Sequence, residues 1–283
     1  METICIYHKG CLDGFGAAWV VREACKRQKK TDIEFYAAAY QEAPPNVENK
    51  DVIIVDFSYK RHLMDSLIEQ ANGVLILDHH KSAENDLTGI FEHEKVSGCF
   101  DMKHSGVMLA WNHFFFGETP PPVLQNIQDR DLWVFKLETT KAVCAALYSY
   151  DQDFEVWDDL INNHDLLVSE GQGLLRQKSR SVNSLIKSCA HEIEFEGHKV
   201  LAANMPHMFA SDAGNIMAID CAFSITYYYD KEGHCNCSLR SAINGVDVSE
   251  IALRYGGGGH KHAAGFRFSS GCMTKLHEVR EAT

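Results

Sequence analysis

The sequence predicts an α/β protein in which a parallel sheet with helices on both faces is linked to a smaller α/β domain with a mixed sheet. Short apolar runs alternate with helical segments through the first half of the chain, as they do in the βαβ units of a parallel sheet. After residue 191 the pattern changes to shorter β-type runs separated by turn residues. The chain has 283 residues, and at about 150 residues per domain two domains are expected.

The first domain is expected over residues 1–175, and its strands and helices alternate in order. Apolar and β-branched runs predict four strands, at residues 3–7, 33–40, 52–55 and 74–77. Helical composition predicts helices at residues 14–26, 60–70 and 106–116, and another that opens at the Pro120–Pro122 break. Residues 139–190 are largely helical in composition, with Gly171-Gln172-Gly173 as the one clear interruption.

The second domain is expected over residues 192–283. The stretch at residues 176–191 begins with basic and serine-rich sequence and has the composition of a linker. The expected elements after it are strands at residues 192–195, 199–203, 222–229 and 235–241 and a helix at residues 248–255. Residues 230–233 form a hairpin turn, and the four glycines before His260 form a loop.

Composition and charge limit the classes of function. The formal net charge of −12 argues against a broad surface for long DNA or RNA, because such a surface needs clustered Lys and Arg. No window approaches the roughly 18 apolar residues that span a membrane, and the N-terminus lacks the layout of a signal peptide. We therefore expect a cytoplasmic protein with no membrane partner and with its ten cysteines reduced.

Residues typical of metal sites follow three of the predicted strands. They are His8, Cys11 and Asp13 after the first strand, Asp56 after the third, and Asp78, His79 and His80 after the fourth. Ligands gather at the carboxyl ends of parallel strands, so these side chains are expected along one edge of one sheet. Imidazoles combined with carboxylates suit a divalent cation such as Mn²⁺, Co²⁺ or Fe²⁺.

Other residues have two interpretations that the sequence leaves open. Asp129 and Asp131, close to Trp133, form either a solvated helix end or a return of the chain to the metal edge. Arg240 ends a predicted strand and is either a surface residue or a phosphate ligand, because its guanidinium matches phosphate oxygens. The glycine run before His260 is either a flexible loop or bare backbone that can approach a phosphate closely.

Two further patterns favour the simpler interpretation. Cys235 and Cys237 alternate on one predicted strand, and no second ligand pair at zinc spacing follows, so a half-buried reduced strand is expected. His234, next to them, is not expected to bind a metal. Three aromatic residues can stack a nucleobase but are expected to be core residues: Phe15, Tyr255 and Phe266.

Together these motifs resemble the DHH phosphoesterase superfamily in its DHH plus DHHA1 form, which includes RecJ-like nucleases, nanoRNases and exopolyphosphatase-related proteins. The resemblance covers nearly the whole chain, and its order is more specific than Asp-His-His alone. The matching segments are His8–Ala18, Val55-Asp56, Asp78-His79-His80, Gln128–Trp133, Ser238–Ser241 and Gly256–Phe266.

The resemblance implies two Mn²⁺-type ions at the edge of the DHH sheet. One ion would be held by His8 and Asp56, and the other by Asp13, Asp56, His79 and Asp129. Asp56 would therefore bridge the two ions.

The resemblance also implies roles for residues that do not bind a metal. Asp78 would orient its neighbours from behind the ligands, and His80 would lie near the substrate or the leaving oxygen. The residues implied in catalysis are thus Asp56, Asp78, His79 and His80. Substrate binding would involve His80 and, in the DHHA1 domain, Arg240, Gly257, Gly258, Gly259 and His260.

Cys11 is a departure from the pattern of many relatives, which have an aspartate at this place two residues before Asp13. A thiolate at Cys11 can still bind a metal and would favour softer ions such as Fe²⁺, Co²⁺ or Zn²⁺. The alternative is a weakly held first ion. We expect retained, metal-selective activity.

The leading hypothesis is a metal-dependent phosphodiesterase that hydrolyses small nucleotides (linear dinucleotides, very short RNA or cyclic nucleotides) to mononucleotides. A second hypothesis is hydrolysis of polyphosphate, pyrophosphate or a bisphosphate nucleotide by the same residues. A third is a nucleotide-binding sensor that lost catalysis with the change at Cys11. The oligomeric state is left open, with a homodimer as one alternative.

Overall fold

The computed structural model describes residues 2–40 and 42–268. The chain divides into two compact units, Met1–Leu175 and Arg176–Thr283. Residues 269–283, the end of the predicted second domain, lie outside the described residues. Each unit is described by itself below.

The first unit is built on a five-stranded sheet in which every strand is parallel to its neighbours, in the order β2-β1-β3-β4-β5. The strands are β1 Thr3–His8, β2 Ile33–Ala38, β3 Asp51–Val55, β4 Gly73–Asp78 and β5 Val96–Phe100. The parallel α/β fold predicted for this part of the chain is confirmed. β5 was not predicted, because it is an edge strand with exposed residues and has no continuous apolar run.

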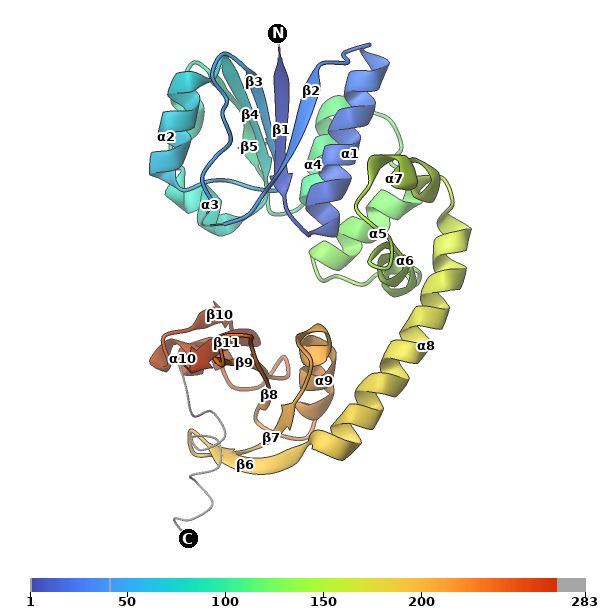
Figure 1. Ribbon diagram of the computed structural model, residues 1–283, viewed down its shortest axis with the longest axis vertical. Coiled ribbons are helices and arrows are strands. Elements are labelled where there is room, and N and C mark those ends of the chain that lie inside the picture. The colour runs from blue at the N-terminus through green and yellow to red at the C-terminus, as the bar shows by residue number, and fades with distance from the viewer. Residues whose placement is uncertain (1, 41, 269–283) are drawn as a thin grey trace. The chain divides into compact units, whose positions relative to one another are not determined.

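Helices cover both faces of this sheet, as the sequence predicts (Figure 1). In chain order they are α1 Leu12–Arg27, α2 Arg61–Gln70, α3 Lys81–Asp86, the 3-10 turn η1 Ile90–Glu92, α4 Gly106–Phe114, α5 Pro122–Asp131, α6 Thr140–Leu147, α7 Phe154–Ile161 and α8 His164–Cys189. One apolar core lies between the sheet and α1, α4 and α5, and a second lies on the opposite face under α2. This burial fixes the strand ends that carry the polar residues.

The expected interruption at Gly171-Gln172-Gly173 is wrong, because these residues lie inside α8. A Cβ atom at Gly171 would lie 1.8 Å from the carbonyl oxygen of Ala142, so this glycine allows α8 to pack directly on α6. The segment expected to be a linker, residues 176–191, is the second half of α8 followed by the start of the next strand. None of the helices in residues 2–40 and 42–268 is both long and apolar enough to cross a membrane.

The second unit has a six-stranded mixed sheet in the order β10-β11-β9-β8-β7-β6. Its elements are β6 His191–Phe195, β7 His198–Asn204, the 3-10 turn η2 His207–Phe209, α9 Ala210–Met217, β8 Ser224–Tyr229, β9 Cys235–Arg240, α10 Val248–Arg254, β10 Gly258–His260 and β11 Ala263–Phe268. Among the strands in the described part of this unit, only β7 and β8 pair in parallel, which confirms the mixed sheet. The glycine run is not entirely a loop, since Gly258 and Gly259 belong to β10.

Candidate metal centre

Three neighbouring strands deliver the polar residues of the first unit to one edge of its sheet. β1 ends at His8, β3 is followed directly by Asp56, and β4 ends at Asp78. Since β1, β3 and β4 are adjacent and parallel, their carboxyl ends meet at the same edge. The sequence-based expectation that these residues converge rests on this geometry.

One group of possible ligands consists of His8, Cys11 and Asp56, whose ligand atoms lie within 4.8 Å of one another. His8 Nδ1 faces Asp56 Oδ2 at 3.7 Å. Both of these atoms are buried and have no hydrogen-bond partner among the described residues. Buried polar atoms without partners are costly and rare, so their presence here calls for a group that satisfies both.

A second group consists of Asp13, His79 and Asp131, again within 4.8 Å of one another. His79 Nε2 lies 3.4 Å from Asp131 Oδ2 and 3.7 Å from Asp13 Oδ2. The same nitrogen is 3.0 Å from Asp56 Oδ1. Asp56 therefore turns one carboxylate oxygen toward each group, as expected of a bridging residue.

These residues fit divalent cations. The donor set of imidazole nitrogens, carboxylate oxygens and one thiol is suited to first-row divalent metals. His8, Cys11 and Asp56 would hold one cation, and Asp13, His79 and Asp131, with Asp56, would hold the other. A cation at the first position would also provide the partner that the buried atoms of His8 and Asp56 lack.

Asp56 occupies its position in a strained backbone conformation. Its φ angle is +53°, in the left-handed region that residues other than glycine rarely adopt. The Asp56 N–H donates to the carbonyl oxygen of Leu77 in the neighbouring β4, which holds the residue in place. Strain of this kind persists only where the surroundings impose it, and it gathers at functional sites.

Asp13 is held by the N-terminus of α4, a contact that the sequence analysis missed. Its carboxylate accepts hydrogen bonds from the N–H groups of Gly106 (2.5 Å) and Val107 (3.0 Å). A Cβ atom at Gly106 would lie 2.4 Å from Asp56 Cβ and 2.9 Å from Asp13 Oδ2. Gly106 is thus needed for α4 to approach both ligands. In the sequence, Gly106 after Ser105 indicated only the start of a helix and gave no sign of the contact with Asp13.

Asp78 lies behind the ligands, fully buried, and organises the Asp-His-His turn. One of its carboxylate oxygens accepts from the Ser58 hydroxyl at 2.6 Å. The other lies 2.6 Å from His80 Nδ1 and accepts from the His79 N–H at 2.7 Å. Because a carboxylate accepts, His80 Nδ1 carries a proton. Ser58, two residues after Asp56, was not identified from the sequence.

Asp129 is not brought to the metal groups. Its carboxylate accepts hydrogen bonds from the N–H groups of Lys136 (2.8 Å) and Leu137 (3.0 Å) and from the Thr140 hydroxyl. The group instead contains Asp131, at the last position of α5. The sequence left open whether this helix end returns to the metal edge. In the structure it does, and the residue that lies there is Asp131.

In the second unit, the structure brings the predicted phosphate-binding residues to one end of the sheet. Arg240 pairs in register with Ala263, and Ala263 pairs with His260, so the three residues lie side by side across β9, β11 and β10. The Arg240 guanidinium also donates to the Ser211 hydroxyl at 2.8 Å. Gly257 lies against β11, where a Cβ atom would be 2.1 Å from the carbonyl oxygen of Gly265.

The remaining candidates of the sequence analysis lie elsewhere. Cys235 and Cys237 are buried in β9, and His234 lies in the turn before it beside Asp230. The three aromatic residues weighed as stacking groups pack in the two cores: Phe15 in the first unit, and Phe266 with Tyr255 stacked on it in the second.

The electrostatics of the cluster predict how pH affects metal binding. Burial and the neighbouring Asp56 and Asp131 carboxylates raise the pKa of Asp13 well above its usual value. Burial lowers the pKa of His79, but the hydrogen bond with Asp56 and the negative charges of Asp13, Asp56 and Asp131 together outweigh burial, and the pKa is raised to about 9. Without metal, His79 therefore carries a proton at neutral pH, and a cation must displace it to bind.

We therefore expect the affinity for Mn²⁺ to rise between about pH 6 and about pH 9, by up to about tenfold per pH unit for each proton displaced. Isothermal titration calorimetry in buffers of different ionisation enthalpy measures both the affinity and the protons released. An affinity that is constant over this range, with no proton release, would contradict the assignment of His79 and Asp13 as ligands.

Substitution of Asp78 tests the arrangement behind the ligands. In Asp78→Asn the amide oxygen would still accept from the His79 N–H and face His80 Nδ1, and the NH₂ group would face the Ser58 hydroxyl, but the negative charge beside the His80 ring would be lost. We expect kcat to fall about 10- to 100-fold with little change in thermal stability. Asp101→Asn is the matched control, because Asp101 forms a similar contact with His104 Nδ1 (2.8 Å) on the surface. Equal activity in Asp78→Asn and Asp101→Asn would exclude the proposed role of Asp78 behind the ligands.

Comparison with known sequences identifies relatives of this chain. Residues 209–282 match the DHHA1 domain family. The uncharacterized protein R106 of Acanthamoeba polyphaga mimivirus is 31% identical over 296 residues, which cover 95% of this chain and 69% of R106. The bifunctional oligoribonuclease and PAP phosphatase NrnA of Mycoplasma genitalium is 26% identical, over 75% of this chain and 67% of NrnA.

Two solved structures share the fold. The pGpG-specific phosphodiesterase PggH from Vibrio cholerae has a TM-score of 0.57 and 13% identity, with 100% of this chain and 97% of PggH covered. RecJ from Thermus thermophilus, solved in complex with Mn²⁺, has a TM-score of 0.51 and 15% identity, with 99% of this chain and 51% of RecJ covered. From the DHHA1 match, these relatives and the Asp-His-His edge of its parallel sheet, the chain belongs to the DHH/DHHA1 phosphoesterase family.

Proposed function

We propose that this chain is a divalent-metal-dependent phosphodiesterase that hydrolyses small nucleotides to mononucleotides. The observation that carries this proposal is the position of the Asp56 carboxylate, which lies between two groups of side chains that could bind a metal. Two cations bound there would activate water and stabilise negative charge on the attacking and leaving oxygens of a phosphodiester. Mn²⁺ suits the imidazole and carboxylate donors, and the Cys11 thiol extends the choice to Co²⁺, Fe²⁺ or Zn²⁺.

The chain's own residues orient this chemistry. The N–H groups at the start of α4 fix the Asp13 carboxylate, and the strained backbone at Asp56 holds its two oxygens toward different groups. Asp78 engages His80 Nδ1, which leaves Nε2 of the same ring as the atom that can contact a substrate oxygen. The hydrogen bond with Asp78 raises the pKa of His80, which favours the doubly protonated ring with a second proton on Nε2. In that form His80 is the candidate for protonating the leaving group, and Asp78 is a positioning residue.

Charge and kinship support a short substrate. A net charge of −12 disfavours long polyanions, whereas a few local cations are enough for one or two phosphates. Arg240 and His260 lie in register on either side of Ala263 in the second sheet and suit phosphate oxygens. NrnA is a bifunctional oligoribonuclease and PAP phosphatase, and PggH is specific for pGpG, so both relatives favour linear dinucleotides and very short RNA over cyclic nucleotides.

The test is a parallel titration of Mn²⁺, Co²⁺, Fe²⁺ and Zn²⁺ into the purified protein. The substrates are a linear dinucleotide, a 2′,3′-cyclic nucleotide, polyphosphate and a 3′,5′-bisphosphate nucleotide. Hydrolysis of the dinucleotide to mononucleotides is the expected result. Release of orthophosphate from polyphosphate or the bisphosphate nucleotide, with the dinucleotide intact, would overturn the proposal. Nucleotide binding without turnover under every metal would indicate a sensor instead.

A further inference from the structure

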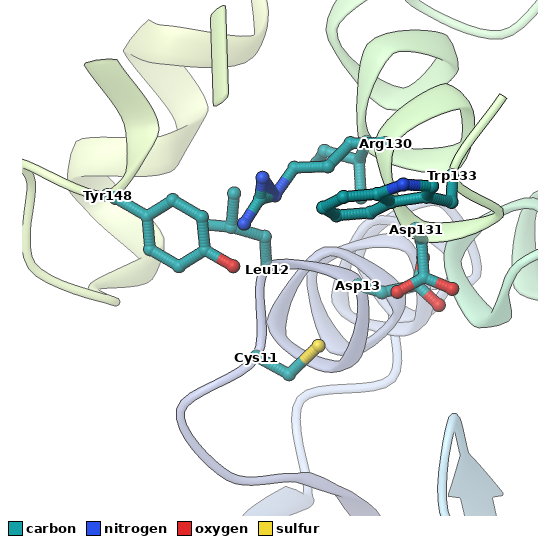
Figure 2. A pocket seen from close by; sticks show the side chains of 8 residues that line it. Cys11, Leu12, Asp13, Arg130, Asp131, Trp133 and Tyr148 are labelled. Carbon is teal, nitrogen blue, oxygen red and sulfur yellow. The ribbon is translucent and has the colours of Figure 1, made fainter. Parts of the chain in front are cut away.

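The loop between α5 and α6, residues 132–139, exposes a tryptophan beside the candidate metal ligands. Trp133 is 66% exposed, whereas the other three tryptophans of the chain are at most 6% exposed: Trp19, Trp111 and Trp157. Trp133 lines a pocket of about 150 Å³ together with Cys11, Asp13 and Asp131 (Figure 2). The indole of Trp133 is thus open to solvent in a pocket that also contains side chains from both groups of possible metal ligands.

This loop is held in a strained conformation. Trp133 and Phe135 have φ angles of +57° and +51°, in a region that residues with bulky side chains rarely adopt. The two rings pack edge to face with centroids 4.8 Å apart, which fixes the indole relative to the loop. An unconstrained surface loop would relax to ordinary angles, so the surrounding structure imposes this presentation of Trp133.

Asp129 is the residue that imposes it. Its main-chain carbonyl accepts hydrogen bonds from the N–H groups of Val134 (3.0 Å) and Phe135 (3.2 Å). Its carboxylate accepts from the N–H groups of Lys136 and Leu137, and from the Thr140 hydroxyl at the start of α6. Five donors therefore converge on one aspartate and close the loop around it. Asp129 acts on the loop that carries the indole.

A positively charged side chain, that of Arg130, lines the same pocket as the Trp133 indole. The Arg130 guanidinium lies over the Tyr148 ring, 4.9 Å from its centroid, and lines the pocket with Trp133 (Figure 2). Among the described residues Arg130 forms no ion pair, although Asp13 and Asp131 line the same pocket. A planar apolar face and a guanidinium next to metal ligands match the base and the phosphate of a nucleotide.

We propose that Trp133 is the nucleobase-stacking platform of this site, with Arg130 beside it to receive a phosphate oxygen and Asp129 as the positioning residue of the loop. This inference rests on the proposed function, since it assigns the part of the site that recognises a nucleotide. Stacking on an indole tolerates every base, so the subsite would favour nucleotides over other phosphate esters without selecting among bases.

Tryptophan fluorescence tests the contact without any turnover. Because the other three tryptophans are buried, the solvent-exposed part of the emission comes from Trp133. We expect 5′-AMP, with Mn²⁺ present, to quench this emission, and ribose 5-phosphate to leave it unchanged. In Trp133→Phe the quenching should disappear. Quenching by 5′-AMP that persists in Trp133→Phe would overturn the assignment.

Kinetics with a linear dinucleotide give a second test. Trp133→Ala is expected to raise KM about 10- to 100-fold while kcat changes little, and Trp133→Phe to recover part of the loss. Phe116→Ala is the matched control, because Phe116 is 91% exposed but does not line the pocket. If the wild-type protein hydrolyses the dinucleotide and Trp133→Ala has an unchanged KM, the stacking inference alone fails. If the wild-type protein hydrolyses no dinucleotide, the proposed function fails, and the fluorescence result still decides the stacking.

A double-mutant cycle tests the positioning by Asp129. Asp129→Asn is expected to raise KM in the wild-type background and to have no further effect in Trp133→Ala, because both changes remove the same stacking contact. Mn²⁺ affinity should be unchanged in Asp129→Asn. Loss of Mn²⁺ binding, or a full KM effect that remains in Trp133→Ala, would overturn the role assigned to Asp129.

Discussion

Asp56→Ala is expected to abolish hydrolysis, with kcat/KM reduced by at least about 10³-fold. The substitution removes the carboxylate whose two oxygens face His8 and His79, so both metal groups lose a ligand at once. Metal ions supply several kcal/mol of transition-state stabilisation, and each 1.36 kcal/mol is a factor of ten in rate. Steady-state kinetics with a linear dinucleotide and saturating Mn²⁺ measure the loss.

Two further variants make this result specific. Asp56→Asn keeps the size of the side chain and tolerates the left-handed φ angle, so equal loss in both variants separates ligand chemistry from misfolding. Arg240→Ala in the second unit is expected to raise KM about tenfold or more and to leave kcat largely intact. Turnover that survives Asp56→Ala but is lost in Arg240→Ala would reverse these roles and reject the account.

Gly106→Ala is expected to be almost as damaging although it removes no ligand. The added methyl would lie 2.4 Å from Asp56 Cβ and 2.9 Å from Asp56 Cα, where backbone cannot yield cheaply. α4 must then move away, and the two N–H groups that fix Asp13 move with it. We expect Mn²⁺ affinity to fall about 10- to 100-fold, and the free energy of unfolding to fall by about 1–3 kcal/mol.

Gly73→Ala provides the control for this variant. Gly73 begins β4 of the same sheet, and a Cβ atom there would make only an ordinary contact, 3.7 Å from the carbonyl oxygen of Lys95. Calorimetric Mn²⁺ titration and thermal unfolding of both variants separate metal binding from stability. A Gly106→Ala protein that binds Mn²⁺ as tightly as Gly73→Ala would show that α4 does not control the ligands.

The convergence of polar residues at the edge of the first sheet could be predicted, because it follows from apolar strands that alternate with helices. Val52–Val55 and Val74–Leu77 are apolar runs that end in polar residues, and the alternation with helices makes the strands parallel. Parallel strands place their carboxyl ends together, so His8, Asp56 and His79 could be brought to one place without coordinates. The edge strand Val96–Phe100 has no such run and was missed.

The choice between Asp129 and Asp131 could not be made from the sequence. Residues two apart on a helix point about 200° apart, so only one of the pair can face the ligands. Which one does depends on how α5 packs, and packing places Asp131 at His79 and Asp129 inside the loop. Gly106 and Ser58 were missed for the same reason, because their contacts join segments far apart in the chain.

Crystals of the full chain soaked in Mn²⁺, with anomalous difference maps, test the metal centre most directly. The account predicts two anomalous peaks, one in contact with His8 and Asp56 and the other in contact with Asp13, His79 and Asp131. A map without ions at these residues, or with the second ion bound by Asp129, would contradict it.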